Sequence, residues 1–198
     1  GSTPAKDYKM FEKIFADSEL RPDMIKIYPC TVVKNSELYQ WHKKGKFKPY
    51  ADKKLIAMLV KVKSKIIPRY CRISRLIRDI PSTEIMAGNK ITNLRQTIQK
   101  EMQKRGIHCQ CLRCREIGHR PTCHSEHIRY AQCKLREESL FKLKLFIDQY
   151  KASGGTEYFL SFEDAKRRVV YAFCRLRLGA DGLYSAFIRE LHTYGRLL

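Results

Sequence analysis

Four cysteines and a histidine lie within the segment CQCLRCREIGHRPTC, numbered 109–123. Three of these thiols, on Cys109, Cys111 and Cys114, can reach one tetrahedral ion only if the backbone between them turns tightly. Zn²⁺ in structural sites takes four nitrogen or sulfur ligands in this geometry. The segment therefore predicts a structural zinc site, which constrains the local chain path more than any other feature of the sequence.

The fourth zinc ligand is open among several side chains. Cys123 is favoured, because an all-thiolate set is typical of structural zinc. The alternatives are His119, His124 and His127. A second interpretation makes the cysteines ordinary strand residues, but thiols at this density would invite oxidation.

The charge of the chain predicts a polyanionic partner. Forty Lys and Arg residues face twenty Asp and Glu residues, so the formal net charge is +20. Solubility of a small domain needs a net charge of only roughly 2 to 8. The excess lies in clusters such as Lys43, Lys44, Lys46 and Lys48, or Arg69, Arg72, Arg75 and Arg78. Such clusters favour phosphate backbones, although any one of them can equally be a solvated helix face.

Composition also predicts the cellular setting. No apolar run approaches the 18 or so residues that a membrane span needs, so we expect one or two globular domains and no membrane. Eight cysteines without a secretory segment are better explained by metal ligands and reduced thiols than by disulfides, which predicts a cytoplasmic protein. The remaining cysteines are expected to be small core residues: Cys30, Cys71, Cys133 and Cys174.

Up to Gly106 the sequence predicts alternating helices and strands. Thr3 and Pro4 can start a first helix, Ser36 can cap a short helix through Trp41, and Asp52 can cap a longer one. Residues 24–28 and 70–77 have the pattern of strands, and a last helix ends at Gly106. Strand–helix units of this kind predict an α/β domain with a parallel sheet.

Beyond Gly106 the period becomes that of strands. Apolar and polar residues alternate over 141–147, which predicts a half-buried strand with Leu145 and Ile147 on its buried face. Gly154 and Gly155 indicate a turn before a strand over 158–162. Residues 168–178 and 184–194 are two further β-rich runs, so this half predicts an antiparallel sheet.

Five sequence blocks stand in order along the chain: DMIKIYP at 23–29, RDIP at 78–81, NLR at 93–95, CLRCREIG at 111–118 and IRELHTYG at 188–195. In these blocks the chain resembles the catalytic subunit of Elongator in its bacterial and archaeal form. That family pairs a radical S-adenosylmethionine domain with a GNAT-type acetyltransferase-like domain and modifies tRNA.

The resemblance implies an α/β fold class with three segments. Residues 1–106 would be the C-terminal part of a partial, TIM-type radical barrel. Residues 107–135 would be the zinc-binding linker, and residues 136–198 would hold the first antiparallel strands of the GNAT-like domain. The zinc ion would then fix the angle between the two domains.

The family's cofactors are a 4Fe-4S cluster, S-adenosylmethionine and acetyl-CoA. No CxxxCxxC cluster motif occurs here, and the chain stops at Leu198, before the expected glycine loop that would cradle the acetyl-CoA pyrophosphate. We therefore expect neither cofactor site to be complete. Whether this chain alone is an enzyme stays open, and no catalytic residue is assigned.

The function implied by the resemblance is the tRNA-binding part of an enzyme that adds a carboxymethyl-type group to carbon 5 of wobble uridine. Arginine and lysine side chains beside the zinc segment would hold the RNA backbone. These residues are Lys26, Arg75, Arg78, Arg95, Lys104, Arg105, Arg113 and Arg115. Tyr28, Tyr50 and Tyr70 are candidates for base stacking, and Arg78 can instead pair internally with Asp79.

Two other classes of protein remain as alternatives. One is a non-enzymatic RNA-binding or scaffold module that needs a partner chain for catalysis. The other is a zinc-dependent DNA-binding protein, which the absence of a recognition-helix pattern disfavours. Independently of this choice, an uncovered strand edge predicts self-association or a partner subunit. Glu190 and His192 share a strand face, but no third partner supports a catalytic pair.

Overall fold

The computed structural model describes residues 2–119, 143–179 and 186–194. The chain packs as two units, the first formed by residues 1–16 and 22–109 and the second by residues 17–21 and 110–198. The expected boundaries at 106 and 135 stay predictions, because most of the segment between them lies outside the described residues. Within the described residues, no helix combines the length and the apolar character that crossing a bilayer requires.

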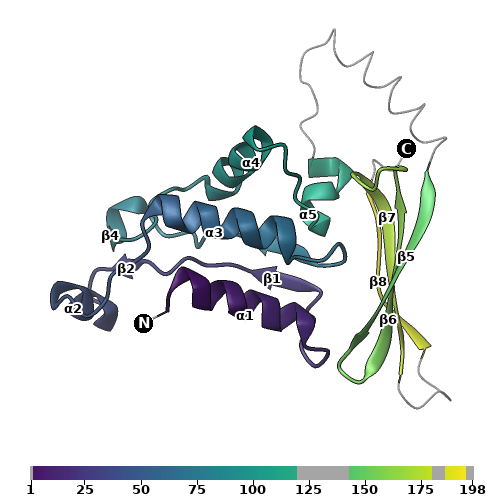
Figure 1. Ribbon diagram of the computed structural model, residues 1–198, viewed down its shortest axis with the longest axis horizontal. Helices are drawn as coiled ribbons and strands as arrows, with labels where there is room; N and C mark the ends of the chain where they lie inside the picture. The colour runs from purple at the N-terminus through teal and green to yellow at the C-terminus, as the bar shows by residue number, and fades with distance from the viewer. Residues whose placement is uncertain (1, 120–142, 180–185, 195–198) are drawn as a thin grey trace, which may run out of the picture. The chain divides into compact units, whose positions relative to one another are not determined.

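The first unit contains most of the helices and two small sheets (Figure 1). Its helices are α1 (Pro4–Ala16), α2 (Glu37–Lys43), α3 (Asp52–Lys65) and α4 (Leu94–Lys104). Its strands are β1 (Met24–Lys26), β2 (Val32–Val33), β3 (Arg72–Arg75) and β4 (Ile85–Ala87), with a 3₁₀ turn over Ser82–Glu84 before β4.

The expected parallel pairing is confirmed for the two strands that the sequence indicated. β1 runs parallel to β3, with Ile25 opposite Ile73. The sequence missed β2 and β4, which pair antiparallel with Val32 opposite Ala87. Strands of two and three residues are too short to show an alternating pattern.

The helix starts follow the expected capping chemistry, with one exception. The hydroxyl of Thr3 accepts a hydrogen bond from the backbone of Lys6 at 3.3 Å, and that of Ser36 accepts from Tyr39 at 3.1 Å. The expectation for Asp52 was wrong. Asp52 is the first helical residue of α3, and the N-cap is Ala51, whose side chain makes no cap hydrogen bond.

Apolar side chains of α3 and α4 form the core of the first unit. Leu59 and Val62 of α3 are fully buried, as are Leu94 and Ile98 of α4. α3 contacts both α1 and α4. Burying an aliphatic side chain of this size is worth roughly 1.5–3 kcal/mol, so these stripes account for much of the unit's stability.

The second unit is a four-stranded antiparallel sheet with a short helix (Figure 1). Its strands are β5 (Lys144–Ala152), β6 (Gly155–Glu163), β7 (Val170–Leu178) and β8 (Ala186–Thr193), hydrogen-bonded in that order. α5 (Leu112–Arg115) and a 3₁₀ turn (Ile117–His119) precede them. The expected antiparallel sheet is confirmed.

The sheet's buried side is opposite to the one expected from its apolar residues. Leu145 and Ile147, expected on the buried face of β5, are 50% and 58% exposed. The side chains that alternate with them, including Asp148, are less exposed. On β6 the fully or nearly buried side chains include Glu157 and Glu163. The sheet therefore buries ion pairs on one face and exposes apolar residues on the other.

Residues 17–21 belong to this second unit through contacts with the β5–β6 turn. The backbone nitrogen of Ser153 donates to the carbonyl of Ser18 at 2.7 Å, and Arg21 donates to the carbonyl of Lys151 at 3.0 Å. The sequence did not indicate this connection, because it joins residues more than one hundred positions apart.

Candidate metal and nucleic-acid sites

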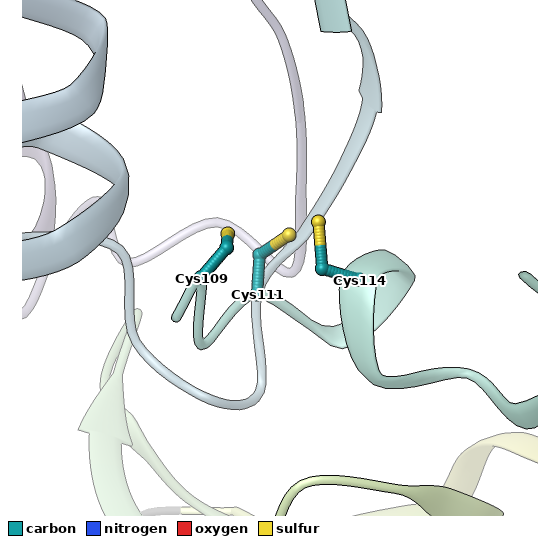
Figure 2. A group of neighbouring side chains, drawn as sticks. All are labelled: Cys109, Cys111 and Cys114. Atoms are coloured by element: carbon teal, nitrogen blue, oxygen red, sulfur yellow. The ribbon is translucent and has the colours of Figure 1, made fainter. Parts of the chain in front are cut away.

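The three clustered cysteines converge in space. The sulfur atoms of Cys109, Cys111 and Cys114 all lie within 4.8 Å of one another. Figure 2 shows the three side chains turned toward the same side, Cys109 and Cys111 from the loop and Cys114 from α5. Cys111 occupies the N-cap position of α5, and the backbone nitrogen of Cys114 donates to its carbonyl at 3.1 Å. The tight backbone turn that the spacing requires is therefore present.

This donor set has the chemistry and the spacing of a metal site. A tetrahedral site with Zn–S bonds of about 2.3 Å places its sulfur atoms about 3.8 Å apart, which a small adjustment of these side chains reaches. Cys111 is buried, while Cys109 and Cys114 are half-buried. Thiols concentrated in this way fit a soft or borderline cation. Three of the four expected ligands can thus act together, whereas Cys123, His124, His127 and the side chain of His119 lie outside the described residues.

An ion pair anchors α5, which carries Cys111 and Cys114, to the sheet. Arg115 Nη1 donates to Glu163 Oε2 at 2.6 Å, and Arg115 Nε donates to the carbonyl of Gln110 at 2.9 Å. The next residue, Glu116, accepts a hydrogen bond from the Tyr194 hydroxyl at 3.0 Å. These contacts fix the backbone on both sides of Cys114.

The basic residues expected to bind RNA differ in exposure and in whether they already pair with a carboxylate. Lys26, Arg78 and Lys104 are exposed. Arg75 and Arg105 are also exposed, but each pairs with a carboxylate four positions away in the sequence. Arg75 pairs with Asp79 at 2.7 Å and Arg105 with Glu101 at 2.5 Å. The alternative pairing of Arg78 with Asp79 is not the one formed, because Asp79 pairs with Arg75.

The other three candidates point into the protein. Arg95 donates from Nη2 to the carbonyls of Ile73 and Ser74, at 2.8 and 3.2 Å, and so braces the end of β3. Arg115 is buried in its ion pair, and Arg113 is half-buried. We therefore base the RNA proposal below on the exposed group.

A pocket of about 370 Å³ opens beyond the carboxyl ends of the parallel strands β1 and β3. Pro29 follows β1, and Ile77 and Arg78 follow β3; Asn89 and Lys90 line another wall. Ligands of parallel-strand folds bind at this end of the strands. The lining of the pocket combines apolar side chains with two cationic side chains, Arg78 and Lys90, and the carboxylate of Asp79.

Glu190 and His192 do not form an isolated acid–base pair. Glu190 accepts a hydrogen bond from Arg175 at 2.6 Å, and His192 lies 3.0 Å from the other carboxylate oxygen. The His192 ring stacks on Phe173, with centroids 5.1 Å apart. This arrangement braces β7 against β8.

The expected core role of the other cysteines holds for one of them. Cys71 is buried, but Cys30 is exposed and Cys174 is half-buried, and Cys133 lies outside the described residues. Partial burial of the Cys30 thiol removes some of its hydration and raises its pKa. A raised pKa keeps this thiol protonated near neutral pH and makes it a poor nucleophile.

Comparison of the sequence with known proteins identifies homologues of this chain. Residues 22–104 match the Radical_SAM C-terminal domain. A protein of Methanocaldococcus infernus named tRNA uridine(34) acetyltransferase is 42% identical over 98% of this chain. The chain is a homologue of the Elongator catalytic subunit. The resemblance drawn from the five sequence blocks is thus confirmed.

Structural comparison agrees with this Elongator homology. The solved archaeal Elp3 of Methanocaldococcus infernus, with an N-terminal deletion, matches 98% of this chain with a TM-score of 0.81 and 40% identity. The Elongator complex protein 3 of Schizosaccharomyces pombe is 30% identical over 96% of the chain. This Elongator homologue spans about a third of the relatives' length, 36% and 34% of the two named proteins, and 45% of the solved chain.

Proposed function

We propose that this chain is the tRNA-binding part of an enzyme that modifies wobble uridine. The observation that carries the proposal is the 42% identity, over nearly the whole chain, to a protein named tRNA uridine(34) acetyltransferase. The net charge of +20 and the exposed side chains of Lys26, Arg78 and Lys104 support it, because phosphate backbones bind such surfaces by counterion release.

The reaction of the whole enzyme is proposed to place an acetyl-derived carboxymethyl group on carbon 5 of the base. An iron–sulfur cluster with S-adenosylmethionine would supply the radical, and acetyl-CoA the two-carbon group. In this proposal the first unit is part of a partial radical barrel, and the β5–β8 sheet opens a GNAT-like domain. The role of this chain's own residues is to hold RNA and to line the pocket beyond β1 and β3.

The cysteine cluster is proposed to bind structural zinc, with Cys123 as the preferred fourth ligand. Zinc would close the turn over residues 109–114 and hold α5 in the orientation that the pair of Arg115 and Glu163 also supports. Such a site needs no open coordination position and therefore no role in the chemistry.

A titration of the chain with a tRNA transcript tests the proposed function. Affinity should fall steeply between about 50 and 200 mM salt, with a logarithmic slope near −0.7 to −0.9 for each phosphate contact. Replacing Lys26 and Lys104 together by Gln should weaken binding and flatten the slope. Replacing Lys9 and Lys13 together by Gln, two exposed lysines of α1, is the matched control and should change little.

The alternative, a non-enzymatic RNA-binding or scaffold module, makes a different prediction for the same preparation. Retained tRNA binding with no acetyl-CoA hydrolysis by this chain would favour the scaffold. Absence of tRNA binding at the lowest salt concentration would reject both readings.

A further inference from the structure

Helix α2 presents an aromatic ring to solvent. None of its residues is buried, and Trp41 is 48% exposed. Tryptophan is highly buried on average, so a half-exposed indole on a short helix is a candidate contact for a partner. Trp41 is also the chain's single tryptophan.

Four exposed lysines follow this indole closely in the sequence. Lys43 and Lys44 end the helix, and Lys46 and Lys48 follow in the next turn, all of them exposed. Together with Trp41 they form what we call the α2 patch. Within the described residues, none of these lysines forms an ion pair with a carboxylate, and Glu37 is the single acidic residue between positions 36 and 51. The α2 patch is therefore a run of positive charge next to one exposed ring.

Local hydrogen bonds hold the α2 patch in one shape. The backbone nitrogen of Lys46 donates to the carbonyl of Trp41 at 2.9 Å, and Gly45 donates to His42 at 3.0 Å. His42 Nδ1 lies 3.0 Å from the carbonyl of Phe47. Gly45 has φ +71°, which a residue with a side chain adopts at a cost. The turn thus holds the backbone of Lys46 against that of Trp41.

A second aromatic ring of α2, that of Tyr39, contacts a lysine of the α2 patch. The Lys43 ammonium lies 4.4 Å from the centroid of the Tyr39 ring, a cation–π contact. Lys43 and Tyr39 are four positions apart and share one side of α2, whereas Trp41, two positions from each, faces another side, so the rings and ammonium groups of the α2 patch lie on more than one side of the helix. Rings interleaved with ammonium groups are the recurring surface of proteins that bind single-stranded nucleic acid.

We propose that the α2 patch binds unpaired nucleotides of RNA, with one base stacked on Trp41 and the flanking phosphates on the lysines. The inference rests on the proposed function and adds a contact site outside the residues assigned above. Stacking selects a single strand, because bases within a duplex have no free face. An acidic protein segment would satisfy the lysines but gains little from a flat exposed indole.

Trp41 is its own reporter for this proposal. Excitation at the red edge of the indole band isolates it from the eleven tyrosines. Titrating the unmodified chain with a short oligouridylate should quench its emission to saturation. A blunt RNA duplex of equal charge, and a polyglutamate peptide, should leave it nearly unchanged.

Substitutions sharpen the test. Trp41→Ala should weaken binding of a labelled oligouridylate by roughly tenfold, while Trp41→Phe should retain most of the affinity. Lys43→Gln and Lys46→Gln should each lower the salt slope by about 0.7. Lys13→Gln is the control of equal charge change. Circular dichroism verifies that each variant keeps its helices.

Three results would overturn the inference: oligouridylate binding without a change in Trp41 emission, equal quenching by duplex RNA, or a peptide response that exceeds the RNA response. The two proposals fail separately. If the chain binds tRNA normally while Trp41→Ala has no effect, only the α2 patch is wrong. If no RNA of any kind binds, the proposed function is wrong as well.

Discussion

Arg115 and Glu163 form an ion pair of 2.6 Å in which the side chains are 3% and 0% exposed. The pair joins α5 to the end of β6. Glu163 also accepts a hydrogen bond from Ser161 Oγ at 2.7 Å, and Arg167 lies 3.4 Å from its second oxygen. The hydrogen bonds of Arg167 to Asp148 and Glu163 outweigh the effect of burial and raise its pKa.

Breaking this pair should be costly. Glu163→Gln removes a carboxylate charge that is hydrogen-bonded to the buried guanidinium of Arg115, and we expect a loss of about 3–5 kcal/mol in the free energy of unfolding. Urea titration followed by circular dichroism measures it. Asp79→Asn, which removes the exposed partner of Arg75, is the control and should cost at most about 1 kcal/mol. Equal losses in the two variants would contradict the role given to burial.

Metal content should follow the cysteine cluster. Purified protein is expected to carry about one zinc per chain, and Cys111→Ser or Cys114→Ser should remove most of it, because a structural site that has lost one of its four ligands holds zinc poorly. Emission spectrometry of the dialysed protein gives the ratio. Cys30→Ser, at an exposed cysteine outside the cluster, should leave the ratio unchanged. Zinc-free wild-type protein that is fully folded would reject the site.

Tyr50 should make stability depend on alkaline pH. Its hydroxyl donates to Asp7 Oδ2 at 2.8 Å, and its pKa is raised by burial first and then by Asp7. Because the folded state holds the proton more tightly, this contribution is complete below the unfolded pKa of about 10 and is lost above it. Tyr50→Phe should cost about 1 kcal/mol at neutral pH and flatten the alkaline decline. If the free energy of unfolding declines equally with alkaline pH in wild type and Tyr50→Phe, Tyr50 is not the group responsible.

The exposed face of the sheet should promote self-association. Ile188 and Leu191 of β8 are 62% and 67% exposed, and Leu145 and Ile147 of β5 lie on the same face. Leu191→Lys should leave the free energy of unfolding within about 0.5 kcal/mol, since the side chain is already solvated. Sedimentation at rising protein concentration should show less association than wild type. Lys13→Gln serves as a surface control; unchanged association in Leu191→Lys would show that this face does not mediate it.

Local chemistry explains how much of this structure the sequence could predict. Helix caps at Thr3 and Ser36 and the cysteine spacing act over a few residues, and each is found where expected. Asp52 shows the limit. An acidic residue favours either the cap or the first turn of a helix, and the chain here places it in the first turn.

The orientation of the β5–β8 sheet could not be predicted, because the pattern rule assigns apolar residues to the buried face. Here Glu157 is buried by two arginines, Arg177 at 2.7 Å and Arg189 at 3.0 Å, which lie on β7 and β8. Such pairing depends on the register between strands, which spacing along one strand does not encode. Trp41 was missed for a related reason: the sequence assigns it to a short helix but not to an exposed position.

The two faces of this sheet should tolerate amino-acid substitution to different extents during evolution. A carboxylate such as Glu157, held between two guanidiniums, can be exchanged only together with its partners, so variation there should arrive as compensated pairs. Across the sheet, single replacements at the solvated aliphatic positions carry no such penalty. We therefore expect homologous sequences to conserve the charged face of the sheet and to vary at the exposed apolar positions. In most β-sheets the apolar face is the conserved one.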